Sequence, residues 1–182
     1  MEFYAGNGPI SADQMWRKEM ESVAPFCVGR GLDPGAGKRT FSPDVVRCDI
    51  SAEHQPQHIC DAIALPFDAN DFDFVVTSHL LEHLLAPRAA LTEWLRVVKP
   101  GGFVANIIPN TIFTRGQNQD PTPHLYEWSP RSFLIEVLNF PPATPNLWWE
   151  AAGAMQGWSE ADLVKIGEAC PRWSFCVVLR KT

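Results

Sequence analysis

Two aspartates and two glycines form the part of this sequence best suited to binding a ligand. Asp33 and Asp49 each end a short apolar run, and Gly35 and Gly37 lie between them. Glycine permits positive φ and lets a ligand approach the main chain, because it has no Cβ. If the two runs are adjacent parallel strands, both carboxylates lie at the sheet edge where open α/β folds bind their ligands. The spacing therefore predicts a ligand site there.

A second group of residues has the types that bind metal ions. His79, Glu82 and His83 match the pattern His-x-x-Glu-His, which places two histidines on one helical face and occurs in inverted zinc proteases. The pattern directly follows a buried apolar run, and no third ligand is identifiable. We therefore expect no metal site.

The elements that must position these residues can be read from apolar runs and cap signals. Strands are predicted at residues 26–32, 45–49, 72–78, 103–108, 147–152 and 173–179. Helices are predicted at residues 11–24, 80–98 with a break at Pro87, 131–139 and 159–169. Residues 99–102 are predicted to form a turn. In the first helix Ser11 and Gln14 have capping-box spacing, and Trp16 and Met20 are expected to face the sheet.

The order of these elements predicts an α/β fold with one doubly wound, mostly parallel sheet. Only seven residues separate Gly37 from Val45. Because a crossover with its helix needs about ten to twelve residues, the first crossover is predicted to be shortened to a loop. The last strand is expected to be antiparallel. At 182 residues the chain is expected to be a single domain.

Composition and charge narrow the classes of partner. The net charge is −6 and no basic stripe is visible, so nucleic acid is an unlikely partner. No signal region and no apolar run of membrane-spanning length is present, which predicts a soluble, cytoplasmic protein without a membrane partner. The five cysteines are odd in number and include no Cys-x-x-Cys pair, which favours buried free thiols. The oligomeric state is not predicted.

Several segments together carry a resemblance to a known family. They are Gly31-Leu-Asp-Pro-Gly-Ala-Gly37, Asp49, Ala64-Leu-Pro-Phe-Asp68, Phe72-Asp-Phe-Val-Val-Thr-Ser78, Leu81-Glu-His83 and Val97-Val-Lys-Pro-Gly-Gly-Phe103. In this order they resemble class I S-adenosylmethionine-dependent methyltransferases of the small-molecule "methyltransferase domain" type. The resemblance covers about residues 29–110, and the similarity is weaker in residues 124–133 and in the final strand. It implies a Rossmann-like fold, S-adenosylmethionine as cofactor, and methyl transfer to a small or medium-sized acceptor.

The resemblance also implies how the first half of the site contacts this cofactor. Main-chain groups of Gly35, Ala36 and Gly37 would bind the amino-acid end. Asp33 would accept hydrogen bonds from the ammonium group. Asp49 would accept both ribose hydroxyls, since a carboxylate offers two acceptor oxygens for two donors.

Further residues are assigned by the same resemblance. Ile50 would pack on the adenine face, and Asp61 and Ala62 would bind the adenine edge. Ser78 and His79 would line the methionine portion of the cofactor. In this interpretation residues 1–25 form an N-terminal arm and helix, residues 26–110 the cofactor-binding half and residues 111–182 the acceptor-side half.

The catalytic residue expected from the resemblance is His124. It lies near Tyr126, in the polar segment where the family builds its acceptor pocket, and a histidine there can take up a proton near neutral pH. The alternative is a loop histidine bonded to the main chain. The tryptophan-rich tail is interpreted as core and oligomer surface more readily than as an aromatic clamp on the acceptor.

Two departures from the family pattern keep another function open. Arg39 stands where the family usually has a third glycine, and the crossover helix is missing, so a catalytically inactive binding or assembly module is the alternative. A dinucleotide-binding oxidoreductase is disfavoured, because its third glycine is absent and Asp49 follows Gly37 by only twelve residues instead of about twenty. The Asn/Asp-Pro-Pro-aromatic motif of nucleic-acid amino-methylating enzymes is absent after residues 72–78.

Overall fold

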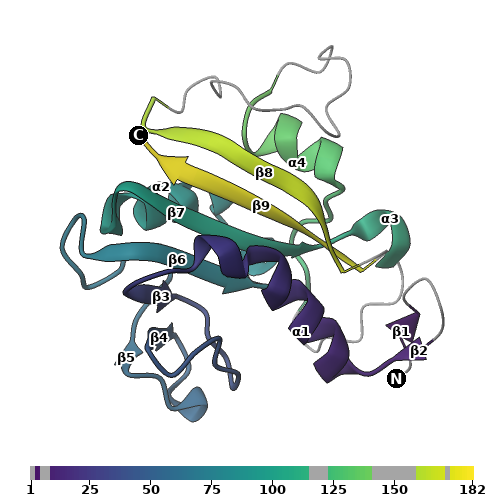
Figure 1. The fold of residues 1–182 in the computed structure, drawn as a ribbon, viewed down its shortest axis with the longest axis horizontal. Coiled ribbons are helices and arrows are strands. Elements are labelled where there is room, and N and C mark those ends of the chain that lie inside the picture. The colour runs from purple at the N-terminus through teal and green to yellow at the C-terminus, as the bar shows by residue number, and fades with distance from the viewer. Residues whose placement is uncertain (1–2, 5–8, 115–122, 141–158, 171–172) are drawn as a thin grey trace.

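The computed structural model describes residues 3–4, 9–114, 123–140, 159–170 and 173–182, and its main feature is a seven-stranded mixed sheet (Figure 1). The strand order is β5-β4-β3-β6-β7-β9-β8. The strands are β3 (Gly31–Asp33), β4 (Val45–Asp49), β5 (His58–Ile59), β6 (Phe72–Ser78), β7 (Val98–Pro109), β8 (Ala161–Cys170) and β9 (Ser174–Lys181). β3 to β7 are parallel, whereas β9 is antiparallel to both β7 and β8. The predicted mostly parallel sheet with an antiparallel last strand is confirmed.

Helices cover both faces of this sheet. They are α1 (Ala12–Val23), α2 (Pro87–Val97), α3 (Thr111–Thr114) and α4 (Pro130–Glu136), with short 3-10 turns η1 (Ala24–Phe26), η2 (Ala52–His54) and η3 (Leu81–His83). A small separate sheet pairs β1 (Phe3–Tyr4) with β2 (Pro9–Ile10). In Figure 1 α1 lies in front of the sheet and α2 lies behind it, as a doubly wound fold requires. Among the described residues, no helix combines the length and the apolar character needed to cross a bilayer.

The core is divided by the sheet because strand side chains alternate between its faces. Val75 and Val177 pack with Trp94 of α2, whereas Val76 and Val178 pack with Met20 of α1. Phe133 and Leu134 of α4 join the Trp94 side. The central strands are therefore buried on both faces, which explains why their sequences are continuously apolar.

Local signals account for the elements that the sequence predicted well. Ser11 accepts a hydrogen bond from the main-chain N–H of Gln14, and the Gln14 side chain accepts one from the Ser11 N–H, so the predicted capping box of α1 is present. Pro87 and Pro130 occupy the first positions of α2 and α4, where proline has no helical hydrogen bond to lose. The segment between β3 and β4 contains no helix, so the shortened first crossover is confirmed.

Three predicted elements differ from the structure. The predicted helix at 159–169 is wrong, because residues 161–170 form β8, which pairs with β9 along most of its length. Residues 99–102 lie inside the continuous strand β7, where Gly101 has a φ of +81° and the register with β6 shifts. Of the first predicted strand, residues 26–32, only residues 31–32 are extended, as part of β3, because residues 24–26 form η1 and Gly29 has a φ of +98°. The predicted strand at 147–152 lies outside the described residues.

The five cysteines are free thiols, as predicted. Cys27, Cys48, Cys60, Cys170 and Cys176 are unpaired. Burial raises the pKa of the Cys27 thiol to about 12 and that of the Cys170 thiol to about 11. These thiols are therefore protonated at neutral pH and behave as apolar side chains.

Candidate cofactor and acceptor site

Asp49 is held as an ionised carboxylate at the carboxyl end of β4. Its side chain is nearly buried, with 7% of the residue exposed. Oδ2 accepts a hydrogen bond from the Gly37 N–H at 2.8 Å, Oδ1 accepts one from the Ser51 N–H at 2.8 Å, and His54 Nδ1 lies 3.0 Å from Oδ2. Burial alone would raise the pKa of Asp49, but these donors lower it below the ordinary value. Because each carboxylate oxygen can accept two bonds, Oδ1 can still accept a ligand hydroxyl.

Asp33 ends the neighbouring strand β3 in a different electrostatic state. Burial, opposed by the Gly35 N–H and by Arg47, raises the pKa of Asp33 to about 7. The Gly35 N–H lies 3.5 Å from Oδ1, so that hydrogen bond is weak. A cationic group bound here would hold Asp33 ionised, because an adjacent opposite charge favours the charged form.

The glycine loop between the two aspartates is tied to the end of β4. The Ala36 N–H donates to the Cys48 carbonyl at 3.0 Å, and Gly37, with a φ of +53°, donates to Asp49. Arg47 Nη2 donates to the Gly37 carbonyl at 2.6 Å. The N–H groups of Gly35, Ala36 and Gly37 thus all donate within the protein, and the Gly35 N–H is the most weakly held.

The residues expected at the adenine lie beside β4 and β5. Asp49 pairs with Ile59 in parallel register, so Ile50 and Asp61 follow the ends of neighbouring strands. Ile50 is 76% exposed, an unusual state for a large apolar side chain. Asp61 Oδ1 accepts a hydrogen bond from the Ile63 N–H, and the Ala62 carbonyl accepts one from the Trp94 indole.

His79 follows β6 in a strained conformation. Its φ is +54°, which is uncommon for a residue with a Cβ and concentrates at functional sites. Nε2 lies 3.0 Å from Oε1 of the buried Glu19 of α1. Desolvation alone would lower the pKa of His79, but two nearby carboxylates raise it to about 9. Glu19 has the larger effect and Glu82 the smaller. His79 is therefore charged at neutral pH beside Ser78, at the end of the strand next to Asp33.

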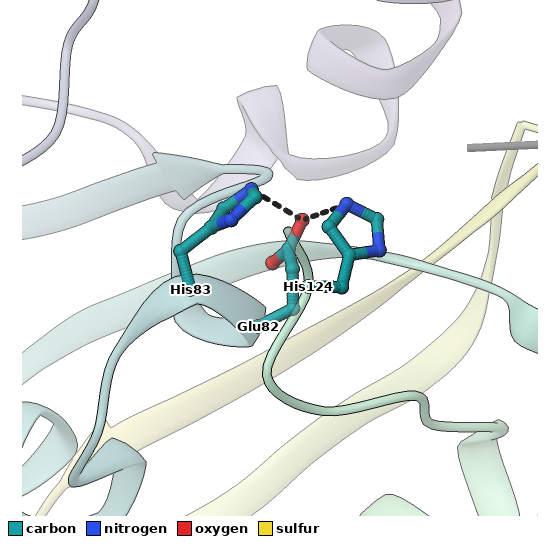
Figure 2. A group of neighbouring side chains, drawn as sticks. All are labelled: Glu82, His83 and His124. Atoms are coloured by element: carbon teal, nitrogen blue, oxygen red, sulfur yellow. Dashed lines mark ion pairs between the residues drawn. The ribbon is translucent and has the colours of Figure 1, made fainter. Parts of the chain in front are cut away.

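His124, the expected base, lies next to Glu82 of η3 (Figure 2). The N–H groups of Leu125 and Tyr126 donate to the Glu82 carbonyl at 2.9 and 3.2 Å, which fixes this segment against η3. His124 Nε2 lies 3.9 Å from Glu82 Oε1, and His83 Nε2 lies at the same distance from that oxygen. The imidazole rings of His83 and His124 are 4.8 Å apart in an edge-to-face arrangement.

The sequence-predicted residues thus fall into two neighbouring groups. Those on β3, β4 and β5 follow the carboxyl ends of these strands, and Ser78, His79 and His124 lie around the end of β6 and η3. Sequence reasoning did not include Glu19, His54 and Glu82 among the site residues. Glu82 was visible in the His-x-x-Glu-His pattern, whereas nothing in the sequence near Glu19 indicates its contact with a residue sixty positions away.

The N-terminal helix covers the loop that replaces the first crossover helix. Arg39 Nη2 lies 3.6 Å from Asp13 Oδ1, and its guanidinium lies 6.0 Å from the centre of the Trp16 ring. Trp16 and Phe41 both pack against the core cluster on the α1 face. Arg39, where a glycine was expected, therefore links the crossover loop to α1.

Sequence comparisons show which known proteins this chain is similar to. Residues 29–106 match the family described as "Methyltransferase domain". The chain is 55% identical over 179 residues to the demethylmenaquinone methyltransferase of Renibacterium salmoninarum, covering 87% of this chain and 73% of that protein. It is 33% identical over 114 residues to the demethylmenaquinone methyltransferase of Clavibacter sepedonicus, covering 51% of this chain and 46% of that protein. The match to this second relative thus spans about half of the relative's length.

A solved structure shows the same fold. The chain aligns with a SAM-dependent methyltransferase from Aquifex aeolicus with a TM-score of 0.60 at 15% identity. The alignment covers 95% of this chain and 100% of that one. At this identity the likeness concerns the fold and not the acceptor.

Proposed function

Because this chain belongs to the class I S-adenosylmethionine-dependent methyltransferases, whose cofactor is S-adenosylmethionine, we propose that it transfers a methyl group to a small-molecule acceptor. The observation that carries the proposal is Asp49. It is an anchored, ionised carboxylate next to the glycine loop, and the exposed Ile50 follows it directly. A carboxylate for the ribose and an apolar side chain for the adenine are what a sulfonium nucleoside needs.

The other residues around these strand ends are assigned to the remaining parts of the cofactor. Asp33 binds the ammonium group, with main-chain groups of Gly35, Ala36 and Gly37 around the amino-acid end. The weak bond between the Gly35 N–H and Asp33 is the one most easily exchanged for a ligand contact. Asp61 and Ala62 face the adenine edge. Ser78 and His79 line the methionine portion.

The relatives are named demethylmenaquinone methyltransferases, which supports a quinone as the acceptor. We take the acceptor to be its reduced, hydroquinone form, because only that form has a ring carbon that becomes nucleophilic on loss of a hydroxyl proton. The bound cofactor supplies an electrophilic methyl group on a sulfonium, and much of the protein's work is to hold the acceptor in attack geometry. His124 takes the proton of a ring hydroxyl, which makes the adjacent ring carbon nucleophilic. The methyl group would pass to that carbon with S-adenosylhomocysteine as the other product, and the ring proton that it displaces would pass to water. The buried Glu82 carboxylate, 3.9 Å from His124 Nε2, stabilises the imidazolium that forms.

A non-catalytic binding module is the second candidate. It is favoured by two observations: the crossover lacks its helix, and the N–H groups of Ala36 and Gly37 are donated to the protein itself. In this case the methyltransferase fold would serve as a partner surface, and the cofactor would bind weakly or not at all.

Calorimetric titration with S-adenosylmethionine and S-adenosylhomocysteine separates the two functions. We expect both to bind, and Asp49→Ala to weaken binding at least about twentyfold, because it removes a charged hydrogen-bond acceptor. Asp44→Ala is the matched control, since Asp44 is an exposed aspartate just before the amino end of β4. Absence of binding at millimolar cofactor would support the module.

Activity is tested by mass spectrometry with a naphthohydroquinone that lacks the ring methyl group. We expect one methyl group to be added, and His124→Gln to lower kcat about a hundredfold while the Kd for the cofactor is unchanged. Methylation of the quinone that does not depend on His124 would exclude this base.

A further inference from the structure

The fold brings His124 beside Glu82 and His83 of the His-x-x-Glu-His pattern, whereas the pattern's other histidine, His79, pairs with Glu19. Glu82 and His83 lie on η3, and His124 comes from a segment about forty residues later. One ligand atom from each residue lies within 4.8 Å of the other two. Figure 2 shows both imidazole rings turned toward the same carboxylate oxygen, Glu82 Oε1. The expectation that no metal binds here was based on the position of the pattern after a buried strand and on the lack of a third ligand, and His124 is a candidate for that ligand.

His83 is oriented as metal-bound histidines usually are. Its Nδ1 lies 3.2 Å from the Pro123 carbonyl oxygen, which can only accept a hydrogen bond. The ring proton of neutral His83 therefore lies on Nδ1, and the bare lone pair lies on Nε2, the nitrogen 3.9 Å from Glu82 Oε1. A hydrogen bond from the second ring nitrogen to a carbonyl is the outer contact that fixes histidine ligands. The carbonyl belongs to the residue just before His124, so one short segment supplies both a ligand and this contact.

The distances suit shared coordination better than direct hydrogen bonding. Hydrogen bonds between nitrogen and oxygen are about 2.7–3.2 Å long, whereas the Nε2 atoms of His83 and His124 each lie 3.9 Å from Glu82 Oε1. His79 Nδ1 lies 3.7 Å from the same oxygen, also beyond hydrogen-bond length. Two ligands of a tetrahedral zinc ion, each about 2.1 Å from the metal, lie roughly 3.4 Å apart. The cluster would need to contract by about 0.5 Å between Glu82 Oε1 and each histidine nitrogen, and by up to about 1.4 Å between the two histidine nitrogens, which lie within 4.8 Å of each other. Small rotations of partly exposed histidines cover such a distance.

The site is pre-organised on the carboxylate side. Glu82 is 1% exposed, and its main-chain carbonyl accepts the N–H groups of Leu125 and Tyr126. The Tyr126 hydroxyl donates to the Leu85 carbonyl at 3.1 Å. These bonds hold η3 and the segment that carries His124 together independently of any ion, so little chain entropy needs to be lost on binding.

We propose that Glu82, His83 and His124 bind one divalent transition-metal ion, with zinc as the ion that best fits two imidazoles and one carboxylate. Three protein ligands leave a coordination position open, as in catalytic zinc sites. This goes beyond the methyl-transfer proposal and does not depend on it. With the ion bound His124 would be a ligand, so it could act as the base of methyl transfer only in the metal-free protein.

The test uses chelator-treated, full-length protein titrated with zinc by calorimetry and with cobalt by visible absorption. We expect one ion per chain and the intense bands of four-coordinate cobalt. His83→Gln and His124→Gln are each expected to weaken zinc binding at least about fiftyfold. His58→Gln is the control for binding at a surface histidine, because His58 is exposed and contacts the Phe67 ring. Glu82→Gln keeps the shape of the buried side chain and should weaken binding as well.

Two outcomes would overturn the proposal. One is the absence of saturable one-to-one binding, and the other is binding of zinc that both histidine variants retain. If circular dichroism shows that a variant does not fold, X-ray absorption at the zinc edge is measured on the wild-type protein in its place. A shell of two imidazoles and one carboxylate is expected there, and a shell with sulfur would assign the ion to cysteines. Cofactor titration of the same samples separates this result from the methyl-transfer proposal, since Asp49→Ala should leave zinc binding intact.

Discussion

At the scale of single residues, Asp33 changes its charge near neutral pH. Its burial raises the pKa from 3.8 to about 7, so the folded protein holds this proton more tightly than the unfolded chain. Ionisation of Asp33 therefore costs stability as the pH rises from about 4 to 7, and the full cost is present above pH 7. The same ionised form is the one that can pair with the cofactor's ammonium group.

Asp33→Asn is therefore predicted to separate stability from binding. The variant should melt a few degrees above the wild type at pH 8, and the difference should shrink at pH 5, where Asp33 keeps its proton. Its affinity for S-adenosylmethionine at pH 8 should fall about tenfold or more, because a charged pair is lost. Calorimetry from pH 5.5 to 8.5 should also show wild-type affinity falling on acidification below about 7. A variant that melts lower at pH 8 and binds normally would contradict both roles.

At the scale of elements, α1 is joined to the end of β6 by an ion pair between Glu19 and His79. The pKa of His79 is raised to about 9. The stability that its positive charge contributes is therefore complete below about pH 6.5 and is lost as the pH rises through 9. Burial alone would raise the pKa of Glu19, but His79 lowers it below 4.5. The stability that the ionised Glu19 contributes is therefore lost on acidification. The pair should therefore stabilise the protein between about pH 5 and 9.

Glu19→Gln is predicted to lower the free energy of unfolding by about 2 kcal/mol at pH 7, because a hydrogen bond between charged groups is lost in the core. The loss should be smaller at pH 10, where His79 is neutral in the wild type. Urea denaturation at both pH values measures this, with Glu21→Gln as the control, since Glu21 is exposed on the same helix. An equal loss at both pH values would show that Glu19 acts through packing and not through charge.

Whether an element could be predicted from the sequence depends on how far apart its contacting residues lie along the chain. The α1 cap and the Asp49 strand end depend on residues within a few positions, so local patterns indicated them. β8 was predicted as a helix because Ser159 and Asp162 mimic a helix start, and the pairing partner that makes residues 161–170 a strand is β9. The contacts of Glu19 with His79 and of Glu82 with His124 join residues about sixty and forty positions apart. No local pattern reports such contacts, and only the completed sheet brings these side chains together.

At the scale of the whole molecule, the predicted single domain depends on a core shared by both halves of the chain. Leu32 of β3, Trp94 of α2 and Phe175 of β9 belong to one buried cluster. Phe175 also meets the Phe133 ring of α4 edge to face, with 5.9 Å between centroids. Lys181 near the C-terminus donates to the Val98 carbonyl at 2.9 Å. Residues 26–110 and 111–182 should therefore unfold together.

Phe175→Ala tests this by local hydrogen exchange. Removing the ring should cost about 3 kcal/mol or more, which corresponds to roughly a hundredfold faster exchange in segments that open only by global unfolding. If the halves are one cooperative unit, peptides from β6 and from β9 should accelerate equally in mass-spectrometric measurements. Val164→Ala, at a position 40% exposed on β8, is the control and should change exchange little. Acceleration confined to residues after 110 would mean that the acceptor-side half unfolds on its own while β6 keeps its protection.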